Sequence, residues 1–284
     1  MNIKLIKADM ALFAIYQTIY SNADIEMWFS WNERLEDTKW ATDQCYFLEL
    51  DGKKIGGAVI TDEFIINPFL IPPFIDGVAF WKYLLKLASR PTIYGALSED
   101  REILTMFDYT TVLTKQIMVC PSDRMETTLP TGFICRVMDV ETEIEKVAQT
   151  LRESFLGGIV YEKTGEQTLD QVVQDIKDSL EYMNVKNFSF VIIEIATNKI
   201  VGACIAGVGE KNPLGYNFVN NLGVLPEYQG KGLAKHLVSC IVTASHGVAP
   251  FVKLCVVEGN SAELLYRQLG FKAGERFSDL KQRK

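Results

Sequence analysis

The chain has 284 residues, about twice the length of a typical domain, so we expect two domains or one large one. Apolar residues make up 48% and charged residues 23%, which supports hydrophobic cores and excludes disordered, collagen-like and low-complexity chains. The formal net charge of −7 disfavours binding to nucleic acid or to an anionic membrane surface.

The cysteines and histidines show no metal-binding spacing. The six cysteines form no CxxC pair, and the histidines, His236 and His246, have no partners at a zinc-site spacing. Most cysteines stand in apolar runs, as is typical of buried thiols in a reducing compartment. The apolar stretch Met10–Tyr16 is too short for a signal peptide, and prolines and charges interrupt Phe64–Leu85 as a membrane span. We therefore expect a soluble cytoplasmic protein without a metal ion.

Helices, a β-hairpin and a strand–helix–strand–helix series are predicted in the first half. In chain order these are helical Met10–Tyr20 and Glu33–Trp40, the hairpin Tyr46–Ile60, the strand Phe64–Leu70, a turn at Pro72 and Pro73, the helix Val78–Leu87, the strand Thr92–Leu97 and the helix Glu99–Phe107. The stretch Pro121–Thr131, rich in Ser, Thr and Pro, then predicts a linker.

The second half predicts the same elements in the same order. They are the helices Glu141–Phe155 and Leu169–Tyr182, the hairpin Val191–Ile205, the strand Tyr216–Val224, a turn at Pro226, the helix Gly232–Ser245, the strand Phe251–Val257 and the helix Ser261–Leu269. The two hairpins match without a gap and share six identical residues. This internal repeat predicts two α/β domains, residues 1–128 and 129–284, each with a mixed sheet and a βαβ crossover. The repeat is compatible with two independent domains and with domains that share strands.

A glycine-containing loop after the strand Tyr216–Val224 carries the clearest chemical signal. Gly230 and Gly232 remove side chains where the backbone can approach a ligand, and the helix that follows exposes unpaired N–H groups. Lys231 adds a positive charge. A loop of this kind at a helix start suits a phosphate or pyrophosphate, although it is neither a Walker loop nor a GxGxxG fingerprint.

The pattern Gln229-x-x-Gly232-x-Ala234 resembles the acetyl-CoA-binding motif of the GNAT (GCN5-related N-acetyltransferase) superfamily. A second block, with Asn260 and Tyr266 ahead of Gly270 and Phe271, is similar to the last conserved region of that family. Asn260, Glu263 and Gly270 also have structural explanations, as a helix N-cap, its capping box and a C-cap. The resemblance implies two GNAT-like acyl-CoA N-acyltransferase domains in tandem, with acetyl-CoA as co-substrate.

This resemblance also implies roles for individual residues. The carbonyl of the thioester would lie against the backbone of Leu222, Gly223 and Val224, and Gly223 could ease a local bulge. The pantetheine or phosphate arm would contact Asn260, and Tyr266 would protonate the departing thiolate unless it is only a packing aromatic. The pyrophosphate would lie over Gln229, Gly230, Lys231, Gly232, Leu233 and Ala234.

No residue stands out as the general base. The strand that carries a Glu in some relatives has no carboxylate here, and its Asn220 and Asn221 could only position a water molecule. The carboxylates of Glu162, Glu166 and Glu258 are candidates, and a water-mediated base or an amine that enters neutral fits equally well. Trp28 and Trp31 lie in an acidic, aromatic segment that could face a cationic acceptor, although such residues more often belong to a core or an interface.

The first half keeps the element order but lacks the ligand residues. Alignment of Pro72 with Pro226 places Ile75 at the Gln229 position and Val78 at the Gly232 position, and the later block has Met106 in place of Tyr266. Such a helix start would crowd a pyrophosphate, so we expect a degenerate domain.

Together these observations predict an acetyl-CoA-dependent N-acetyltransferase whose second domain is catalytic and whose acceptor is an amine of a small molecule or a peptide. The alternatives are an acyltransferase with another acyl donor or acceptor and a catalytically silent acyl-CoA sensor or scaffold. Nucleic acid and membranes are not expected as partners, and a homodimer is left open.

Overall fold

The computed structural model describes residues 2–20, 44–209 and 216–283, apart from the side chain of residue 182. By its internal contacts the chain forms two compact units: residues 1–116 together with 275–284, and residues 117–274. These contacts place residues 117–128 and 275–284 differently from the predicted halves 1–128 and 129–284. The predicted helix Glu33–Trp40, as well as Trp28 and Trp31, lies outside the described residues.

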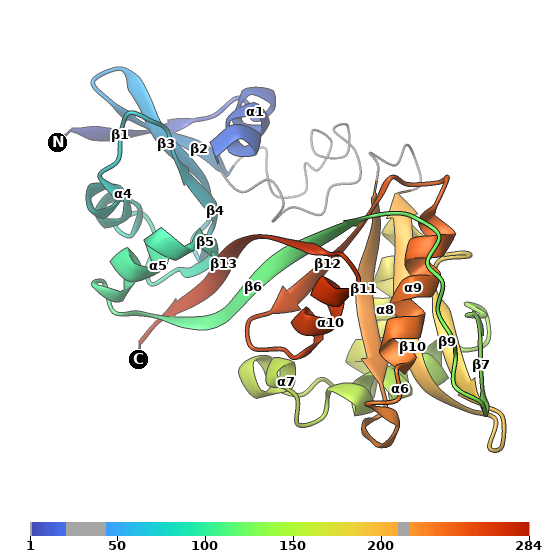
Figure 1. Ribbon diagram of the computed structural model, residues 1–284. Coiled ribbons are helices and arrows are strands. Elements are labelled where there is room, and N and C mark those ends of the chain that lie inside the picture. Colours follow the sequence, from blue (N-terminus) through green and yellow to red (C-terminus); the bar gives the residue numbers. More distant parts are fainter. Residues whose placement is uncertain (1, 21–43, 210–215, 284) are drawn as a thin grey trace. The chain divides into compact units, whose positions relative to one another are not determined.

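The first unit is a mixed sheet between two layers of helices (Figure 1). Its strands are ordered β1-β2-β3-β4-β5-β13-β6, and β4 and β5 are parallel. The elements are β1 (Ile3–Lys7), α1 (Met10–Tyr20), β2 (Cys45–Leu50), β3 (Lys53–Ile60), β4 (Phe64–Leu70), α4 (Gly77–Leu84), β5 (Thr92–Leu97) and α5 (Ser98–Thr105), completed by parts of β6 (Tyr109–Pro121) and β13 (Lys272–Gln282).

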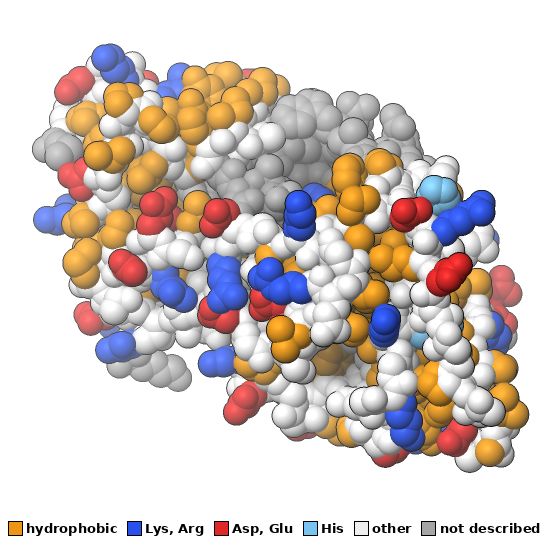
Figure 2. All heavy atoms as spheres, viewed as in Figure 1, with side chains coloured by type: hydrophobic (Ala, Val, Ile, Leu, Met, Phe, Trp, Pro, Cys, Tyr) orange, Lys and Arg blue, Asp and Glu red, His pale blue; other side chains and the backbone are white. Residues whose placement is uncertain are grey.

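The alternation of the strands produces two cores in this unit. On β2, Phe47 faces the core under α1 and Leu48 faces the core under α4 and α5, because successive side chains of a strand point to opposite faces. The helix α1 also carries exposed apolar residues, and Figure 2 shows hydrophobic side chains gathered over it. The exposed residues of α1 are Leu12, Ile15, Ile19 and Tyr20.

The second unit has the same plan. Its strands follow the order β6-β12-β11-β10-β9-β7, with β8 paired to β10, and β11 and β12 are parallel. The elements are the end of β6, β7 (Phe133–Val137), α6 (Ile144–Phe155), α7 (Ile159–Thr164), α8 (Leu169–Tyr182), β8 (Met183–Asn184), β9 (Phe190–Glu194), β10 (Lys199–Gly209), β11 (Tyr216–Val224), the 3₁₀ turn η2 (Pro226–Tyr228), α9 (Leu233–Ser245), β12 (Phe251–Val257), α10 (Ala262–Gln268) and the start of β13.

Helices cover both faces of this second sheet (Figure 1). On β9, Ile192 packs in the core under α9, whereas its neighbours Val191 and Ile193 pack in the core under α6 and α8. The predicted α/β fold is confirmed: each unit contains the predicted hairpin, β2–β3 or β9–β10, and one β–α–β crossover between parallel strands. No helix in the described part of the chain is long and apolar enough to cross a membrane.

Five strands and one helix are additions to the predicted elements: β1, β6, β7, β8, β13 and α7. The strand β13 has the largest consequence, because its residues 277–280 pair with β5 of the first unit. The predicted linker also differs from the structure at its ends. Pro121 still belongs to β6, and residues 122–130 have no regular structure but are held in the second unit, where Met125 donates its backbone N–H to Thr243 Oγ1 at 3.0 Å.

Candidate active site

The strands β11 and β12 diverge toward their ends. Their parallel pairing begins at Tyr216 opposite Phe251 and ends at Val219 opposite Leu254, although both strands continue. The cause is a register shift against β10: Ile205 faces Asn221 and Ala206 faces Val219, so one residue of β11 is inserted as a bulge. A bulge bends its strand and interrupts pairing. The backbone of β11 therefore turns away from β12.

The inserted residue is Asn220, which corrects the expectation that Gly223 eases the bulge. A glycine is needed at position 223 for a different reason. A Cβ at Gly223 would lie 2.0 Å from Ser154 Oγ and 3.2 Å from a methyl carbon of Leu151. Only a residue without a side chain lets α6 pass this close to β11.

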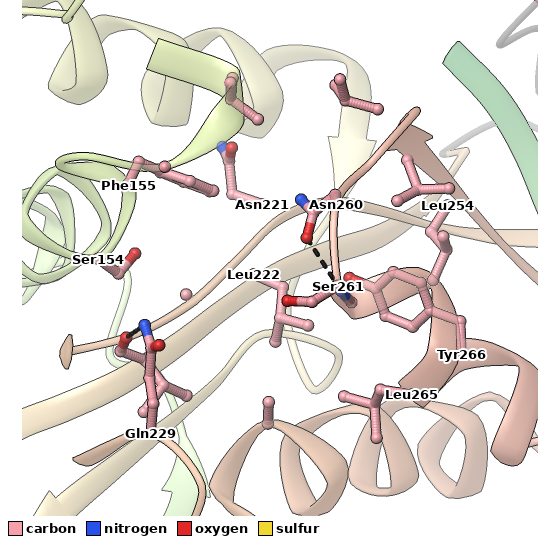
Figure 3. A pocket seen from close by; sticks show the side chains of 18 of the residues that line it. Ser154, Phe155, Asn221, Leu222, Gln229, Leu254, Asn260, Ser261, Leu265 and Tyr266 are labelled. Carbon is pink, nitrogen blue, oxygen red and sulfur yellow. Dashed lines mark hydrogen bonds between the residues drawn. The ribbon is translucent and has the colours of Figure 1, made fainter. Parts of the chain in front are cut away.

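The divergence opens a pocket of about 750 Å³ within the second unit, a size typical of small-molecule sites. Figure 3 shows the side chains of Leu222, Gln229 and Tyr266 around it, from β11, from the following loop and from α10. The predicted site residues that line the pocket are Leu222, Gly223, Val224, Gln229, Gly230, Gly232, Leu233, Ala234, Asn260 and Tyr266.

The loop before α9 leaves the helix start open. Gly230 and Gly232 have φ of 74° and 82°, a left-handed conformation that glycine adopts without strain. A Cβ at either position would meet no atom within 4 Å, so the space beside both residues is empty. No side chain caps α9, whose N-cap is Gly232. The first N–H groups of the helix are therefore available to an anion in the pocket.

Gln229 fixes the loop to the end of β11, because its Nε2 donates to the backbone carbonyl of Val224 at 3.0 Å. Leu225, the next residue, donates its backbone N–H to Val201 on β10. Adjacent residues of a strand direct their amides to opposite edges. The N–H groups of Val224 and of Leu222 therefore face the open edge of β11, on the pocket side.

Lys231 is the one predicted cofactor residue that does not line the pocket. Its Nζ lies over the ring of Tyr228, 4.7 Å from the ring centroid. The hydroxyl of Tyr228 in turn donates to Glu194 Oε2 at 3.0 Å. Hydrogen bonds from Thr197 and Tyr228 lower the pKa of Glu194, and the charge of Lys231 adds to this effect.

The helix α10 begins after Asn260, whose Oδ1 accepts the backbone N–H of Ala262 at 2.9 Å. The side chain of Asn260 thus caps the first turn, although the N-cap residue itself is Ser261. The backbone N–H of Asn260 donates to the carbonyl of Val257 at 3.0 Å, whereas the predicted capping box has it donate to Glu263. The carboxylate of Glu263 accepts hydrogen bonds from Arg267, at 2.8 and 3.0 Å. Gly270, with φ of 88°, follows the end of the helix as predicted.

Tyr266 lies on α10 and is only 7% exposed, with its ring 5.9 Å from that of Phe271. Burial raises the pKa of its hydroxyl well above the ordinary value of 10.0. The phenol is therefore protonated at neutral pH. It borders the pocket and also packs against the core, so both interpretations of this residue find support in its position.

None of the described residues lining the pocket is Asp, Glu or His. Asn220 and Asn221 line it, and Asn220 Nδ2 donates to Ser179 Oγ at 2.6 Å. The three carboxylates considered as bases, on Glu162, Glu166 and Glu258, are not among the lining residues.

Sequence reasoning missed one wall of the pocket, formed by the end of α6 and by α7. Ser154 and Phe155 come from α6, and Tyr161 comes from α7. The hydroxyl of Tyr161 is buried without a hydrogen-bond partner, and burial raises its pKa. A six-residue helix is too short to show a periodic pattern, so only the Gly157-Gly158 break before it signals a change of element.

Comparison with known proteins supports the GNAT resemblance. Residues 186–273, which include every predicted cofactor residue and Tyr266, match the family profile of the acetyltransferase (GNAT) domain. None of the curated proteins compared with the chain matches it.

Solved structures match along nearly the whole chain. A GCN5-related N-acetyltransferase from Sphaerobacter thermophilus is 17% identical, with a TM-score of 0.70 over 99% of this chain and 95% of that chain. A tandem GNAT protein from the clavulanic acid biosynthesis pathway is 12% identical, with a TM-score of 0.57 over 98% of both chains. A GNAT-family acetyltransferase from Colwellia psychrerythraea is 11% identical, with a TM-score of 0.58 over both chains in full.

At these identities the solved structures show the fold, and the family profile locates its acetyltransferase part in the second unit. Residues 186–273 thus match a GNAT acetyltransferase domain, and the chain as a whole has the fold of tandem GNAT proteins.

Proposed function

We propose that the second unit binds acetyl-CoA in the pocket between β11 and β12 and transfers the acetyl group to an amine. The observation that carries this proposal is the open start of α9, where Gly232 leaves the helix N–H groups uncapped beside empty space. A helix N-terminus with a partial positive charge favours an anion such as a pyrophosphate. Apart from Lys231, the other residues assigned to the cofactor line the same pocket.

The acyl group would lie against β11. Attack of the amine on the thioester carbonyl forms a C–N bond and leaves negative charge on the carbonyl oxygen. The N–H groups of Leu222 and Val224 face the open edge of the strand and can donate to that oxygen. Collapse of the intermediate breaks the C–S bond, and the thiolate of CoA leaves with the electron pair.

Tyr266 is proposed as the general acid. Its hydroxyl borders the pocket from α10, and the raised pKa of this phenol keeps it protonated at neutral pH. A proton passed from the phenol to the departing thiolate would produce the free thiol of CoA. Tyr161, which comes from α7 and lines the same pocket, is the alternative donor, because its buried hydroxyl has no hydrogen-bond partner.

The ammonium form of the acceptor must lose a proton before its nitrogen can attack, and no carboxylate is present among the described residues lining the pocket to accept that proton. We therefore propose that it leaves through a water molecule beside Asn221, or that the amine enters already neutral. In the first case Asn221 positions the water without itself taking up the proton.

A catalytically silent acyl-CoA sensor is the second candidate, and the lack of a pocket carboxylate favours it. One assay separates the two. Purified protein is titrated with acetyl-CoA by calorimetry, and the release of free thiol is then followed with a panel of small and peptide amines. The enzyme proposal expects one site per chain and amine-dependent thiol release; binding without release for any amine would support the sensor, and no binding would overturn both.

A further inference from the structure

A cluster of two cysteines and a histidine lies in the second unit, apart from the pocket. Cys135 comes from β7, and His236 and Cys240 come from α9. One ligand atom of each side chain, the two sulfurs and a ring nitrogen, lies within 4.8 Å of the others. No other group of three Cys, His, Asp or Glu side chains comes this close in the part of the chain that the structure describes.

The spacing of cysteines and histidines along the chain shows no metal pattern because the fold, not the local sequence, brings the three residues of the cluster together. His236 and Cys240 are four residues apart on α9 and therefore share one face of the helix. The third member is brought in by the fold, since Cys135 precedes Cys240 by 105 positions.

The separation of the two sulfurs suits a shared ion. The Sγ atoms of Cys135 and Cys240 are 3.9 Å apart. Two thiolates bound to one zinc ion at about 2.3 Å with tetrahedral angles lie about 3.8 Å from each other. A disulfide would need a sulfur–sulfur distance of about 2.05 Å. The distance between the two sulfurs therefore fits two ligands of one metal ion and not a disulfide.

The histidine supplies a second observation. Its Nδ1 is buried and has no hydrogen-bond partner, although most buried polar atoms in proteins have one. All three residues are partly exposed, so the cluster is not sealed from solvent. A water molecule would complete the four-coordination that Zn²⁺ prefers.

We propose that Cys135, His236 and Cys240 bind one thiophilic metal ion, with Zn²⁺ as the first probe. Two thiolates and one imidazole are a ligand set that Zn²⁺ prefers, and binding would release the thiol protons to solvent. The ion would join β7, which ends the strand order of the second unit, to the first turns of α9. That helix starts directly after the glycine loop, so the metal would stabilise the segment that presents this loop.

The test uses the full chain, freed of metal by a chelator and kept reduced with a phosphine. Zn²⁺ is titrated by competition with a chromophoric chelator, and Co²⁺ is added in parallel to look for thiolate-to-cobalt absorption. We expect one ion per chain, a higher melting temperature with Zn²⁺ and a charge-transfer band with Co²⁺. Either Cys240→Ser or His236→Gln should weaken binding more than the roughly 10–100-fold that loss of a supporting hydrogen bond costs.

Matched controls come from the same chain. His246→Gln changes the other histidine, and Cys255→Ser changes an exposed cysteine outside the cluster; both variants should bind Zn²⁺ as the parent does. Because Cys240→Ser could fail to fold, circular dichroism is recorded for each variant and His236→Gln stands as the second arm. Equal Zn²⁺ affinity in the parent and in folded His236→Gln, or a Cys135–Cys240 disulfide in place of metal, would overturn the proposal.

Discussion

The two units build the same β–α–β crossover and differ at the start of its helix. In the second unit Gly232 begins α9 with no side-chain cap. In the first unit Asp76 begins α4, and its Oδ1 accepts the backbone N–H of Ala79 at 2.9 Å. The carboxylate of Asp76 thus accepts a hydrogen bond from the first turn of α4. The first N–H groups of α9 have no such side-chain acceptor. A single capping residue can thus distinguish a helix start that the chain itself satisfies from one that is left open, without changing the fold.

The later helix of each unit shows the same contrast. The spacing that places Met106 at the Tyr266 position also places Asp100 at the Asn260 position. Met106 is 63% exposed, whereas Tyr266 is 7% exposed and borders the pocket. Asp100 is buried and accepts the Nε1–H of Trp81 at 2.6 Å, so it holds α5 to α4. In the first unit the Asp100 position thus serves packing, and the side chain of Met106 is largely exposed.

A third difference concerns the residue at which β4 or β11 packs against a neighbouring helix. The alignment of Pro72 with Pro226 places Phe69 at the Gly223 position. The ring of Phe69 packs 5.6 Å from that of Phe13 on α1, whereas Gly223 lets Ser154 of α6 approach the backbone of β11. The second unit therefore brings a helix end to the pocket rim, and the first unit fills the equivalent space with an aromatic ring.

The largest expected effect tests the helix starts. We expect Gly232→Glu to lower the affinity for acetyl-CoA by at least about 100-fold, because the added carboxylate repels the pyrophosphate. The loss of hydrogen bonds to this charged group sets the magnitude, since each contributes ~1.5–3 kcal/mol. Val78→Glu, at the equivalent position of the first unit, should leave the affinity unchanged. Calorimetry measures both, and Gly232→Ala controls for the strain of a side chain at φ of 82°. Equal losses in the Val78 and Gly232 variants would contradict the asymmetry.

The next effect concerns the later helices. Tyr266→Phe should lower turnover by ~10²–10⁴-fold and leave acetyl-CoA affinity nearly intact, because only the proton for the thiolate is lost. Tyr161→Phe removes the other buried pocket phenol and is the matched comparison. Free-thiol release at saturating acetyl-CoA measures the effect. Full turnover of Tyr266→Phe with a slow Tyr161→Phe would move the acid to α7.

Local signals allowed much of the fold to be predicted. The bounds of β4, β5, β11, β12 and α8 agree with the predicted ranges, because prolines, glycines or polar turns end each apolar run. The strand β13 has no comparable signal. Its sequence is largely polar and charged, and its buried Phe277 and Leu280 pair with β5, which lies far earlier in the chain. Pairing over such a separation leaves no local pattern.

The site also divides into residues with a local sequence signal and residues without one. The loop residues Gln229 and Gly232 could be predicted because a backbone conformation and a helix start require particular residue types in a fixed order. The wall from Ser154 to Tyr161 could not, because these residues belong to no motif and reach the pocket through the close packing of α6 on Gly223.

A smaller effect tests the buried carboxyl of the first unit. Burial raises the pKa of Asp100 from 3.8 to about 6, and the hydrogen bond from Trp81 offsets this only in part. The folded state therefore holds the proton more tightly than the unfolded state. The stability that this group contributes is present below about pH 4 and is lost as the pH rises to about 6.

Asp100→Asn keeps an acceptor for Trp81 and removes the charge. We expect it to raise the free energy of unfolding at neutral pH by up to about 3 kcal/mol and to flatten its pH dependence. Urea unfolding of both proteins at a series of pH values measures this. A variant with the parent's pH profile would show that Asp100 is not the titrating group, and the reverse change Asn260→Asp should introduce no such slope if its position serves the pocket.

The smallest effect tests the close approach of α6 to β11. A Cβ at residue 223 would overlap with Ser154 Oγ at 2.0 Å and with Ser154 Cβ at 2.9 Å. We expect Gly223→Ala to lower the free energy of unfolding by about 1–2 kcal/mol, near the lower end of overpacking costs because the Ser154 hydroxyl can rotate away. Adding Ser154→Gly removes both clashing atoms, so the two changes should couple favourably in a double-mutant cycle measured by urea unfolding. Purely additive losses would mean that Gly223 is required by the backbone of β11 and not by its contact with Ser154. The close packing of α6 on β11, where the first unit has Phe69, would then not explain the position of the pocket wall.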